Sequence, residues 1–203
     1  MSTDRGARRT GRPPLTERRR AQTRLAIARE AVRLFTAQGV AATSAEEIAA
    51  AAGISARTLW RYFPTKESCV LPLLTPGIEV AARALAGWPP GRDVTDFLDE
   101  LERGGDVLSD VTSLLDLVRL TRTEPGLRAV WLQVHGDAEP VFAAALARRA
   151  GRPAGDLDIQ VRAAMVNAAL RVAVEHHAEH GATDLLATVR TALRTVADGL
   201  ASP

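Results

Sequence analysis

The most restrictive stretch of this sequence is TSAEEIAAAAGISARTLWRYFPTKE, at residues 43–67. It contains two short helical patterns separated by a glycine, and each pattern follows a serine or threonine that can cap a helix. Two capping boxes are available to the first helix, because Thr43 stands three residues before Glu46 and Ser44 three residues before Glu47. The stretch is therefore expected to form a pair of short helices joined by a tight turn.

The second helix of the pair is bounded on both sides. Ser55 is its expected cap, and it must end before Pro64, since a residue that precedes proline is pushed out of the helical conformation. Upstream, between Glu17 and a stop signal at Gly39, apolar residues recur at helical spacing and predict a longer first helix. Three helices in this order match the helix-turn-helix unit, whose last helix enters the major groove of DNA.

The second short helix has two different faces. Leu59 and Phe63 are four residues apart and share the face expected to pack on the core. Arg57, Trp60 and Arg61 fall on another face, which is free to meet DNA. The alternative is an aromatic core segment with Trp60 packed inward, although Leu59 and Phe63 already supply an inward pair.

These residue types suit two kinds of DNA contact. An arginine can bind guanine with two hydrogen bonds in the major groove, which fits Arg57 and Arg61. Thr58, Tyr62 and Lys66 suit phosphate oxygens, which position a protein on DNA without reading its sequence.

The stretch resembles the helix-turn-helix signature of the tetracycline-repressor (TetR/AcrR) family of bacterial regulators, and the resemblance covers residues 20–70. Trp60 departs from the family pattern, in which tyrosine or phenylalanine is usual at this position. The resemblance implies DNA contacts at the positions that match the motif, which are Ser44, Ser55, Arg57, Thr58, Trp60, Tyr62 and Lys66.

Charge is divided unevenly along the chain. Residues 1–66 hold 13 Lys and Arg against 5 Asp and Glu, whereas residues 67–203 hold 13 against 19. A basic end of this kind is typical of nucleic-acid binding, and a solubilising tail is the alternative. We therefore expect a flexible basic arm at residues 1–16 and a DNA-binding domain at 17–70. The family resemblance implies a ligand-binding and dimerisation domain at 71–203.

The remainder of the chain is predicted to be helical, so the fold class is all-α. Glycine and proline clusters divide it into helices, and strand patterns are absent from the sequence. Pro72 and the TPG at residues 75–77 are expected to interrupt the helix that connects the two domains, because proline removes a backbone donor. We interpret this interruption as a hinge that lets the DNA-binding domain tilt when a ligand binds.

Two final helices are predicted at about residues 157–180 and 184–200. Each carries a narrow row of apolar residues at three- and four-residue spacing, which suits helix-against-helix packing. The rows could be internal packing, but the family resemblance implies a four-helix interface in a homodimer that binds a palindromic operator. The expected interface residues are Val166, Leu170, Ala173, Leu186, Val189, Leu193, Val196 and Leu200.

Residues 123–181 resemble, less specifically, a C-terminal subgroup described as binding acyl-CoA-like ligands. The resemblance implies a pocket between the middle helices for a small-molecule effector, either acyl-CoA-like or another apolar metabolite. Each of the pocket residues could equally belong to the core or the surface. The expected apolar lining is Trp131, Phe142 and Met165, with Arg119, His135 or Asn167 as polar anchors.

The sequence HHAEH at residues 176–180 matches the zinc-peptidase pattern H-x-x-E-H and raises a rival hypothesis, a metallohydrolase. In that hypothesis His176 and His180 would bind zinc and Glu179 would act as the base. The motif lies in a predicted last helical turn, where histidines also interact favourably with the helix dipole, and no third ligand can be assigned. We therefore expect neither an enzyme nor a metal or other cofactor.

The expected function is a ligand-responsive transcriptional regulator, most simply a repressor released from its operator by a small molecule. A DNA-binding protein without a ligand switch is the main alternative. No apolar signal region and no run of about 18 uncharged apolar residues is evident, so we expect a cytoplasmic protein with no membrane span. The single cysteine, Cys69, is expected to be a small buried side chain in a reducing compartment.

Overall fold

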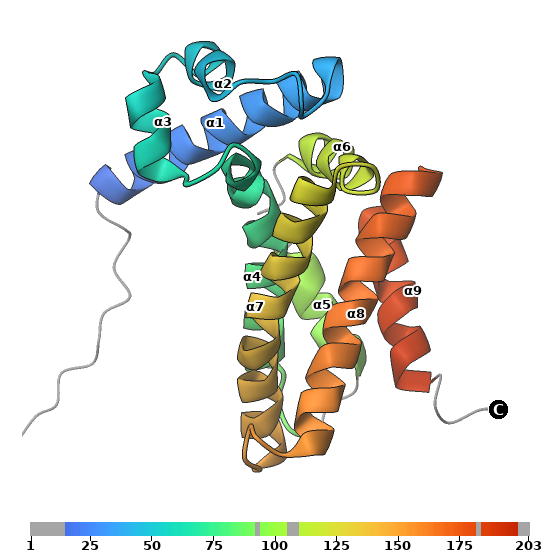
Figure 1. The fold of residues 1–203 in the computed structure, drawn as a ribbon. Helices are drawn as coiled ribbons and strands as arrows, with labels where there is room; N and C mark the ends of the chain where they lie inside the picture. The colour runs from blue at the N-terminus through green and yellow to red at the C-terminus, as the bar shows by residue number, and fades with distance from the viewer. Residues whose placement is uncertain (1–14, 92–93, 105–109, 182–183, 199–203) are drawn as a thin grey trace, which may run out of the picture.

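The structure is a computed structural model that describes residues 15–91, 94–104, 110–181 and 184–198, and all of its regular structure within these ranges is helical (Figure 1). The expected all-α class is thus confirmed. The elements are α1 Leu15–Gln38, α2 Ala45–Ala51, α3 Ala56–Tyr62, the 3-10 helix η1 Glu67–Val70, α4 Leu71–Gly87, α5 Val94–Gly104, α6 Val111–Leu120, α7 Pro125–Ala150, α8 Leu157–His180 and α9 Leu185–Asp198.

Helices α1 to α3 form a small head at one end of the molecule (Figure 1). Of the two possible capping boxes before α2 the structure forms one: Ser44 Oγ accepts from Glu47 N at 3.1 Å, and Glu47 accepts from Ser44 N at 2.7 Å. Gly53 takes the left-handed conformation, at φ 68°, that the turn into α3 requires. Ser55 then caps α3 by accepting from Thr58 N at 3.2 Å, as predicted.

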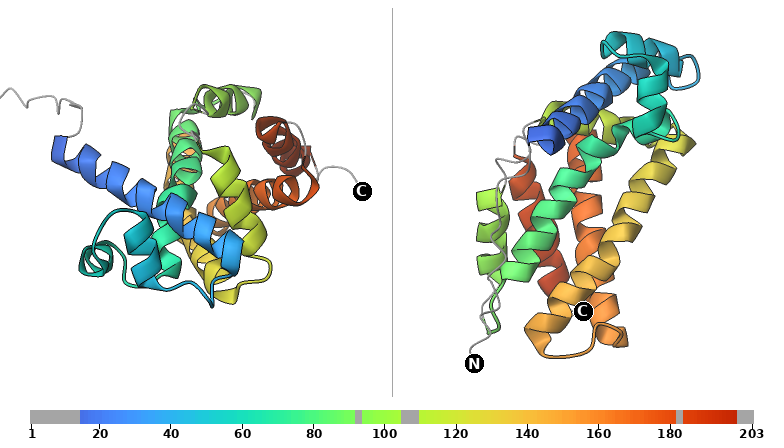
Figure 2. Two further views of the ribbon diagram at one scale, coloured as in Figure 1. Left: turned by 90° about the horizontal axis from the view of Figure 1, so that it is seen from above. Right: turned by 90° about the vertical axis from the view of Figure 1, so that its left-hand side faces the viewer.

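The other helices form an elongated body below the head (Figures 1 and 2). Helix α4 descends from the head and packs along α7, α7 packs on α8, and α8 packs on α9. Helix α6 lies across the top of the body under α1, and α5 lies beside α4 and α9. The body thus reaches the head through α4 and α6.

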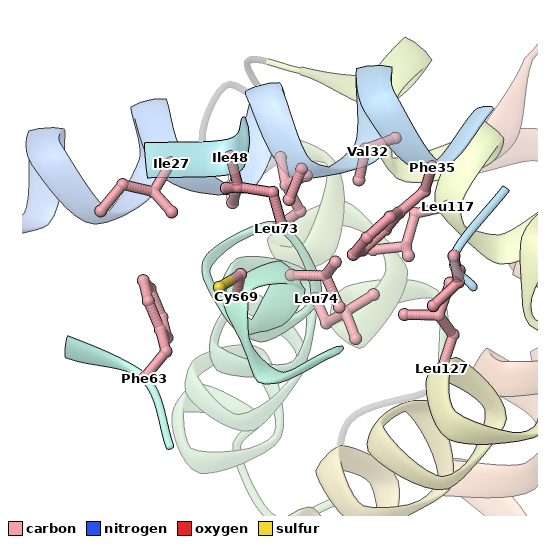
Figure 3. Packing of buried hydrophobic residues seen from close by; sticks show 14 of the residues in the cluster. Ile27, Val32, Phe35, Ile48, Phe63, Cys69, Leu73, Leu74, Leu117 and Leu127 are labelled. Atoms are coloured by element: carbon pink, nitrogen blue, oxygen red, sulfur yellow. The ribbon is translucent and has the colours of Figure 1, made fainter. Parts of the chain in front are cut away.

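The apolar core of the head continues into the body (Figure 3). Phe35 of α1, which is 1% exposed, lies in one buried cluster with Leu74 of α4, Leu117 of α6 and Leu127 of α7. Cys69 is buried in the same cluster, as expected, and burial raises the pKa of its thiol to about 12. The head is therefore attached to the body by packing as well as by the chain.

The predicted interruption at residues 72–77 is wrong, because α4 runs without a break from Leu71 to Gly87. Pro72 lies in the first turn of α4, where the backbone N–H has no partner within the helix and none is lost. Pro76 lies inside the helix and leaves the Pro72 carbonyl without its usual donor, but it does not end the helix. Any movement of the head must therefore involve α4 as a whole.

By length and composition, the apolar segment Glu67–Gly87 is also sufficient to cross a membrane, with a mean hydropathy of 1.4. No other described helix meets that test. In its most apolar window of 18 residues, 44% is buried inside the protein. The segment contributes residues to both apolar clusters, as the core helix of a globular fold does.

The two prolines of α4 give a matched test of its continuity. Replacing Pro76 by Ala should restore a helical hydrogen bond and raise the free energy of unfolding by about 1–2 kcal/mol more than replacing Pro72 by Ala does. Both variants gain the same freedom in the unfolded chain, so their difference reports the helix. Denaturant unfolding of each purified variant measures this difference, and equal effects would contradict an unbroken α4.

Candidate nucleic-acid interface and effector cavity

Helix α3 presents an exposed surface of positive and aromatic side chains. Arg57, Trp60 and Arg61 are exposed, and Trp60 retains 46% of its accessible surface. Leu59 and Phe63, at 0% and 1% exposure, attach the opposite side of the helix to the core. Trp60 therefore does not belong to the core. Leu59 and Phe63 are the pair that packs inward, as predicted.

The serine and threonine hydroxyl groups of the predicted contact set are already engaged within the head. Ser44 Oγ and Ser55 Oγ act in the caps of α2 and α3, and Ser55 Oγ lies 2.9 Å from Thr58 Oγ1. Tyr62 is half-buried, and the Arg61 guanidinium lies 5.5 Å from the centre of its ring. These side chains stand at the ends of the helices, where DNA could replace or share their internal bonds.

Lys66 is placed differently from the phosphate-binding role predicted for it. Its Nζ atom donates to the backbone oxygens of Val40 at 2.6 Å and Thr43 at 2.9 Å, so that it ties η1 to the loop between α1 and α2. One of its three protons remains for another partner. In this structure Lys66 positions the helix-turn-helix.

A further basic group adjoins α3 that the sequence analysis did not assign to DNA. Arg19, Arg20 and Arg24 are exposed on the first turns of α1, and the Arg24 guanidinium lies 5.3 Å from the ring centre of Phe63, at the end of α3. The run ERRR at residues 17–20 was a visible signal for Arg19 and Arg20. They extend the positive surface along α1.

The body contains an apolar, partly open cavity of about 80 Å³ between α4 and the helices facing it. It adjoins five helices besides α4, and among the described residues that line it the polar side chains are Trp131 and His135 of α7. Apolar wall residues include Ile78 and Val80 of α4, Leu101 of α5, Leu114 of α6, Val174 of α8 and Val189 of α9.

The six predicted ligand residues do not form a single site. Trp131 and His135 line the cavity, whereas Phe142 is packed in the core and Met165 lines a separate open groove of about 500 Å³. Arg119 lies at the surface, paired with Asp116. These residues do not meet in one pocket of the described structure, because Arg119 is carried by α6 and the others lie at different levels of α7 and α8.

A layer of polar side chains lies behind the cavity between α7 and α8. His135 Nδ1 is 2.7 Å from Asn167 Oδ1, and Trp131 Nε1 donates to Glu175 at 2.8 Å. Burial alone would raise the pKa of Glu175, but hydrogen bonds from Trp131 and Arg128 outweigh it and the pKa is lowered. Burial lowers the pKa of His135, although the Asn167 hydrogen bond opposes the shift.

The predicted dimer rows on α8 and α9 are used inside the subunit. Leu170 and Ala173 of α8, and Val189 and Leu193 of α9, are buried in the second apolar cluster at 8% exposure or less. Val166, Leu186 and Val196 are half-buried, and Leu200 lies outside the described residues. The rows thus join α8 to α9 and the body core, as in the internal alternative.

The HHAEH segment does not form a metal site in the described structure. His176 and His180 are exposed with stacked rings 4.2 Å apart, but Glu179 is paired with Arg122, and the buried His177 lies 3.2 Å from Thr188 Oγ1. Among the described residues, no group of three or more His, Cys, Asp and Glu side chains is placed to hold a metal ion.

Comparison with known proteins matches both ends of the chain. Residues 27–73 match the family described as bacterial regulatory proteins, tetR family, and residues 108–201 match the MftR C-terminal domain. The chain is 33% identical over 147 residues to the HTH-type transcriptional regulator TcmR of Streptomyces glaucescens, covering 68% of this chain. The matched region spans 65% of TcmR's own length.

Solved structures give the same assignment. The chain is similar to Thermus thermophilus FadR, a TetR-family transcriptional repressor solved with lauroyl-CoA, at 25% identity and a TM-score of 0.53 over 89% of this chain and 96% of that one. The Bacillus halodurans fatty acid degradation regulator FadR, at 20% identity, shares the fold with a TM-score of 0.60 over 89% and 97%. With both of its ends matched and its fold shared, this chain belongs to the TetR family of bacterial regulatory proteins.

Proposed function

We propose that the protein is a homodimeric transcriptional regulator of the cytoplasm, most simply a repressor, that binds a palindromic DNA operator and is released by a small apolar molecule. The observation that carries the proposal is the α3 surface, where Arg57, Trp60 and Arg61 are exposed on a helix fixed by two fully buried residues. A capped, immobilised helix with this surface suits insertion into a major groove.

The residues of the head divide into two roles. Arg57 and Arg61 have the donor geometry to bind guanine, and Trp60 offers an apolar edge to a thymine methyl group. Ser44, Ser55, Thr58 and Tyr62 lie where hydroxyl groups could bind phosphate, together with the arginines of α1 and the spare proton of Lys66. The first group would carry sequence preference and the second general affinity.

A dimer is needed because one recognition helix covers only a few base pairs, and two placed about 34–36 Å apart read a palindrome. Helix α8 has a second apolar stripe on its outer side, separate from the buried row. Its members are spaced by three and four residues, and Leu157, Val161 and Val172 are 77%, 48% and 51% exposed. The stripe consists of Leu157, Val161, Ala164, Ala168 and Val172. We place the dimer interface on this α8 outer stripe, in place of the rows buried inside the subunit.

The effector would act through α4. Its middle part lines the body cavity with Ile78 and Val80, and its first turn places Leu73 and Leu74 in the core under the head. A cavity of about 80 Å³ is below the ~300 Å³ of ordinary ligand pockets, so a ligand must displace a wall to enter. A ligand that binds only the opened form would favour it over the operator-binding form.

The neighbours support an apolar effector without identifying it. Thermus thermophilus FadR was solved with lauroyl-CoA, and the Stenotrophomonas maltophilia repressor SmeT, similar in fold alone at 22% identity, was solved with triclosan. An acyl-CoA-like effector and a compact aromatic one are thus both compatible with this fold. The remaining alternative, a DNA-binding protein without a switch, predicts that no small molecule changes operator affinity.

A salt bridge links the head directly to the body. Arg29 Nε of α1 lies 2.5 Å from Asp110 Oδ2, and the same carboxylate caps α6 by accepting from Ser113 N. Burial alone raises the pKa of Asp110, but hydrogen bonds from Ser113 and Arg29 outweigh it and the pKa is lowered. We propose that the pair fixes the angle of α1 relative to α6.

Selection of bound sequences from a random duplex pool tests the function itself. A palindromic winner is expected, and Arg57→Ala should lower affinity for it by about 1–3 kcal/mol while affecting random DNA much less. Arg83→Ala, which removes an exposed arginine from the body, is the matched control. Recovery of no preferred sequence would remove the regulator proposal, and equal losses on both DNAs would make Arg57 a phosphate contact.

Two valines of nearly equal exposure test the dimer interface. Val172 on the α8 outer stripe is 51% exposed and Val141 on α7 is 52% exposed. Val172→Glu should convert the dimer to a monomer, because a carboxylate would be buried without a partner, whereas Val141→Glu should leave the dimer intact. Sedimentation velocity measures both, and the reverse result would place the interface on α7.

The Arg29–Asp110 pair is tested by a double-mutant cycle on operator affinity. Arg29→Ala and Asp110→Asn should each lower affinity by about twofold to fivefold, and the double variant should be no worse than either one. The pKa of Asp110 is lowered in the folded protein. The stabilisation that its ionised carboxylate gives the folded protein is therefore complete above the usual Asp pKa and declines as pH falls through the lowered pKa. Arg152→Ala, at the far end of the body, is the control. Additive losses would show that the pair is not a coupling element.

A further inference from the structure

One residue of the cavity lining, His135, contains a buried hydrogen-bonding atom without a partner. His135 is 4% exposed, and its Nε2 atom has no hydrogen-bond partner among the described residues. Its other ring nitrogen, Nδ1, is bonded to Asn167 on α8, so Nε2 points away from that contact. An unsatisfied polar atom in a buried site costs free energy, and a ligand that pairs with it recovers that cost.

The orientation of the Asn167 amide can be deduced from its partners. Nδ2 of Asn167 lies 2.9 Å from the backbone oxygen of His135 and 3.1 Å from Oε1 of Glu139. Both partners only accept hydrogen bonds, so the amide nitrogen must face them and the amide oxygen must face the imidazole. That oxygen also only accepts, so Nδ1 of His135 carries the proton of this hydrogen bond.

Burial favours the neutral form of the His135 imidazole ring. Burial is the main cause that lowers its pKa, and the nearby Arg171 and Arg128 act in the same direction, while Asn167 and Glu175 oppose them. A neutral ring with its proton on Nδ1 has a lone pair on Nε2. Nε2 can therefore accept a hydrogen bond but cannot donate one.

We propose that His135 Nε2 selects the effector by accepting a hydrogen bond from a hydroxyl group, so that the cavity takes an apolar phenol or alcohol. The apolar walls suit the rest of such a molecule, since every described residue that lines the cavity is apolar except Trp131 and His135. A carboxylate would bring a charge and only acceptors, and a thioester oxygen is likewise an acceptor. The inference deepens the proposed function and rests on it.

The placement of positive charge separates this ligand class from acyl-CoA. Within the described part of the chain no arginine or lysine lines the cavity, whereas the separate groove of about 500 Å³ carries Arg149, Arg152 and Arg162 on its walls. The phosphates of a coenzyme A would favour the groove. The two ligand classes are thus assigned to different places on the body.

The test uses the full-length dimer and matched pairs of probes. In titration calorimetry, each member of a series from 4-ethylphenol to 4-hexylphenol should bind roughly three- to tenfold more tightly than the methyl ether of the same chain length. His135→Phe keeps an aromatic ring beside Trp131 but removes the acceptor, so it should abolish this preference. His177→Phe makes the same change at the 5%-exposed histidine that does not line the cavity, and should retain the preference.

A second measurement does not require a variant to fold. Long-range proton–nitrogen correlation spectra of the wild-type protein should show His135 protonated on Nδ1 only, with the Nε2 resonance shifting when 4-butylphenol is added. A proton on Nε2 overturns the proposal. Equal affinity for the phenols and their methyl ethers also overturns it, as does the absence of binding by both. Binding of lauroyl-CoA alone, unaffected by His135→Phe, also overturns it.

The operator experiment keeps this inference separate from the proposed function. If the protein selects a palindrome but shows no preference for phenols, the regulator stands and the effector class is wrong. If phenols bind through His135 but no palindrome is selected, the ligand site stands and the regulatory function is wrong.

Discussion

The packing of α4 against both ends of the molecule is the constraint on which the other features depend. Its first turn contributes Leu73 and Leu74 to the apolar core beneath the head, where Phe35 of α1 also lies (Figure 3). Its middle part forms one wall of the body cavity. Because close-packed interiors transmit displacement, a change in cavity volume should reach the head through α4, which packs on α1 and η1. A broken α4 would have absorbed that displacement at the break.

The polar layer between α7 and α8 makes the cavity selective in a way that apolar walls alone do not. Leucine and valine side chains distinguish ligands mainly by size, and one methylene more or less changes affinity only modestly. The Asn167 amide is fixed by two acceptors, so it fixes the imidazole proton and the character of Nε2. A single acceptor in an otherwise apolar space discriminates more strongly, since a ligand without a donor leaves it unpaired.

The sequence predicted local features well and long-range ones poorly. The caps at Ser44 and Ser55 and the two faces of α3 depend on residues within four positions of one another, and each was predicted. By contrast, Lys66 meets carbonyl oxygens 23 and 26 residues away, so its positioning role had no local signal. The continuity of α4 was missed for another reason. The effect of a proline depends on where the helix begins. Helix α4 begins only after η1, at Leu71, so Pro72 lies in its first turn, where proline is tolerated.

The apolar rows on α8 show how a spacing argument can select a helix without deciding between its faces. Leu170 and Ala173 lie on the side of α8 that packs in the body core, and Leu157, Val161 and Val172 lie on the other side. Each set follows helical spacing, so periodicity alone cannot decide which one meets a second subunit. A surface helix needs only one apolar side, and a helix apolar on opposite sides is expected to be covered on both. One subunit covers only the inner side, which leaves the outer stripe as the surface that a second copy has reason to bury.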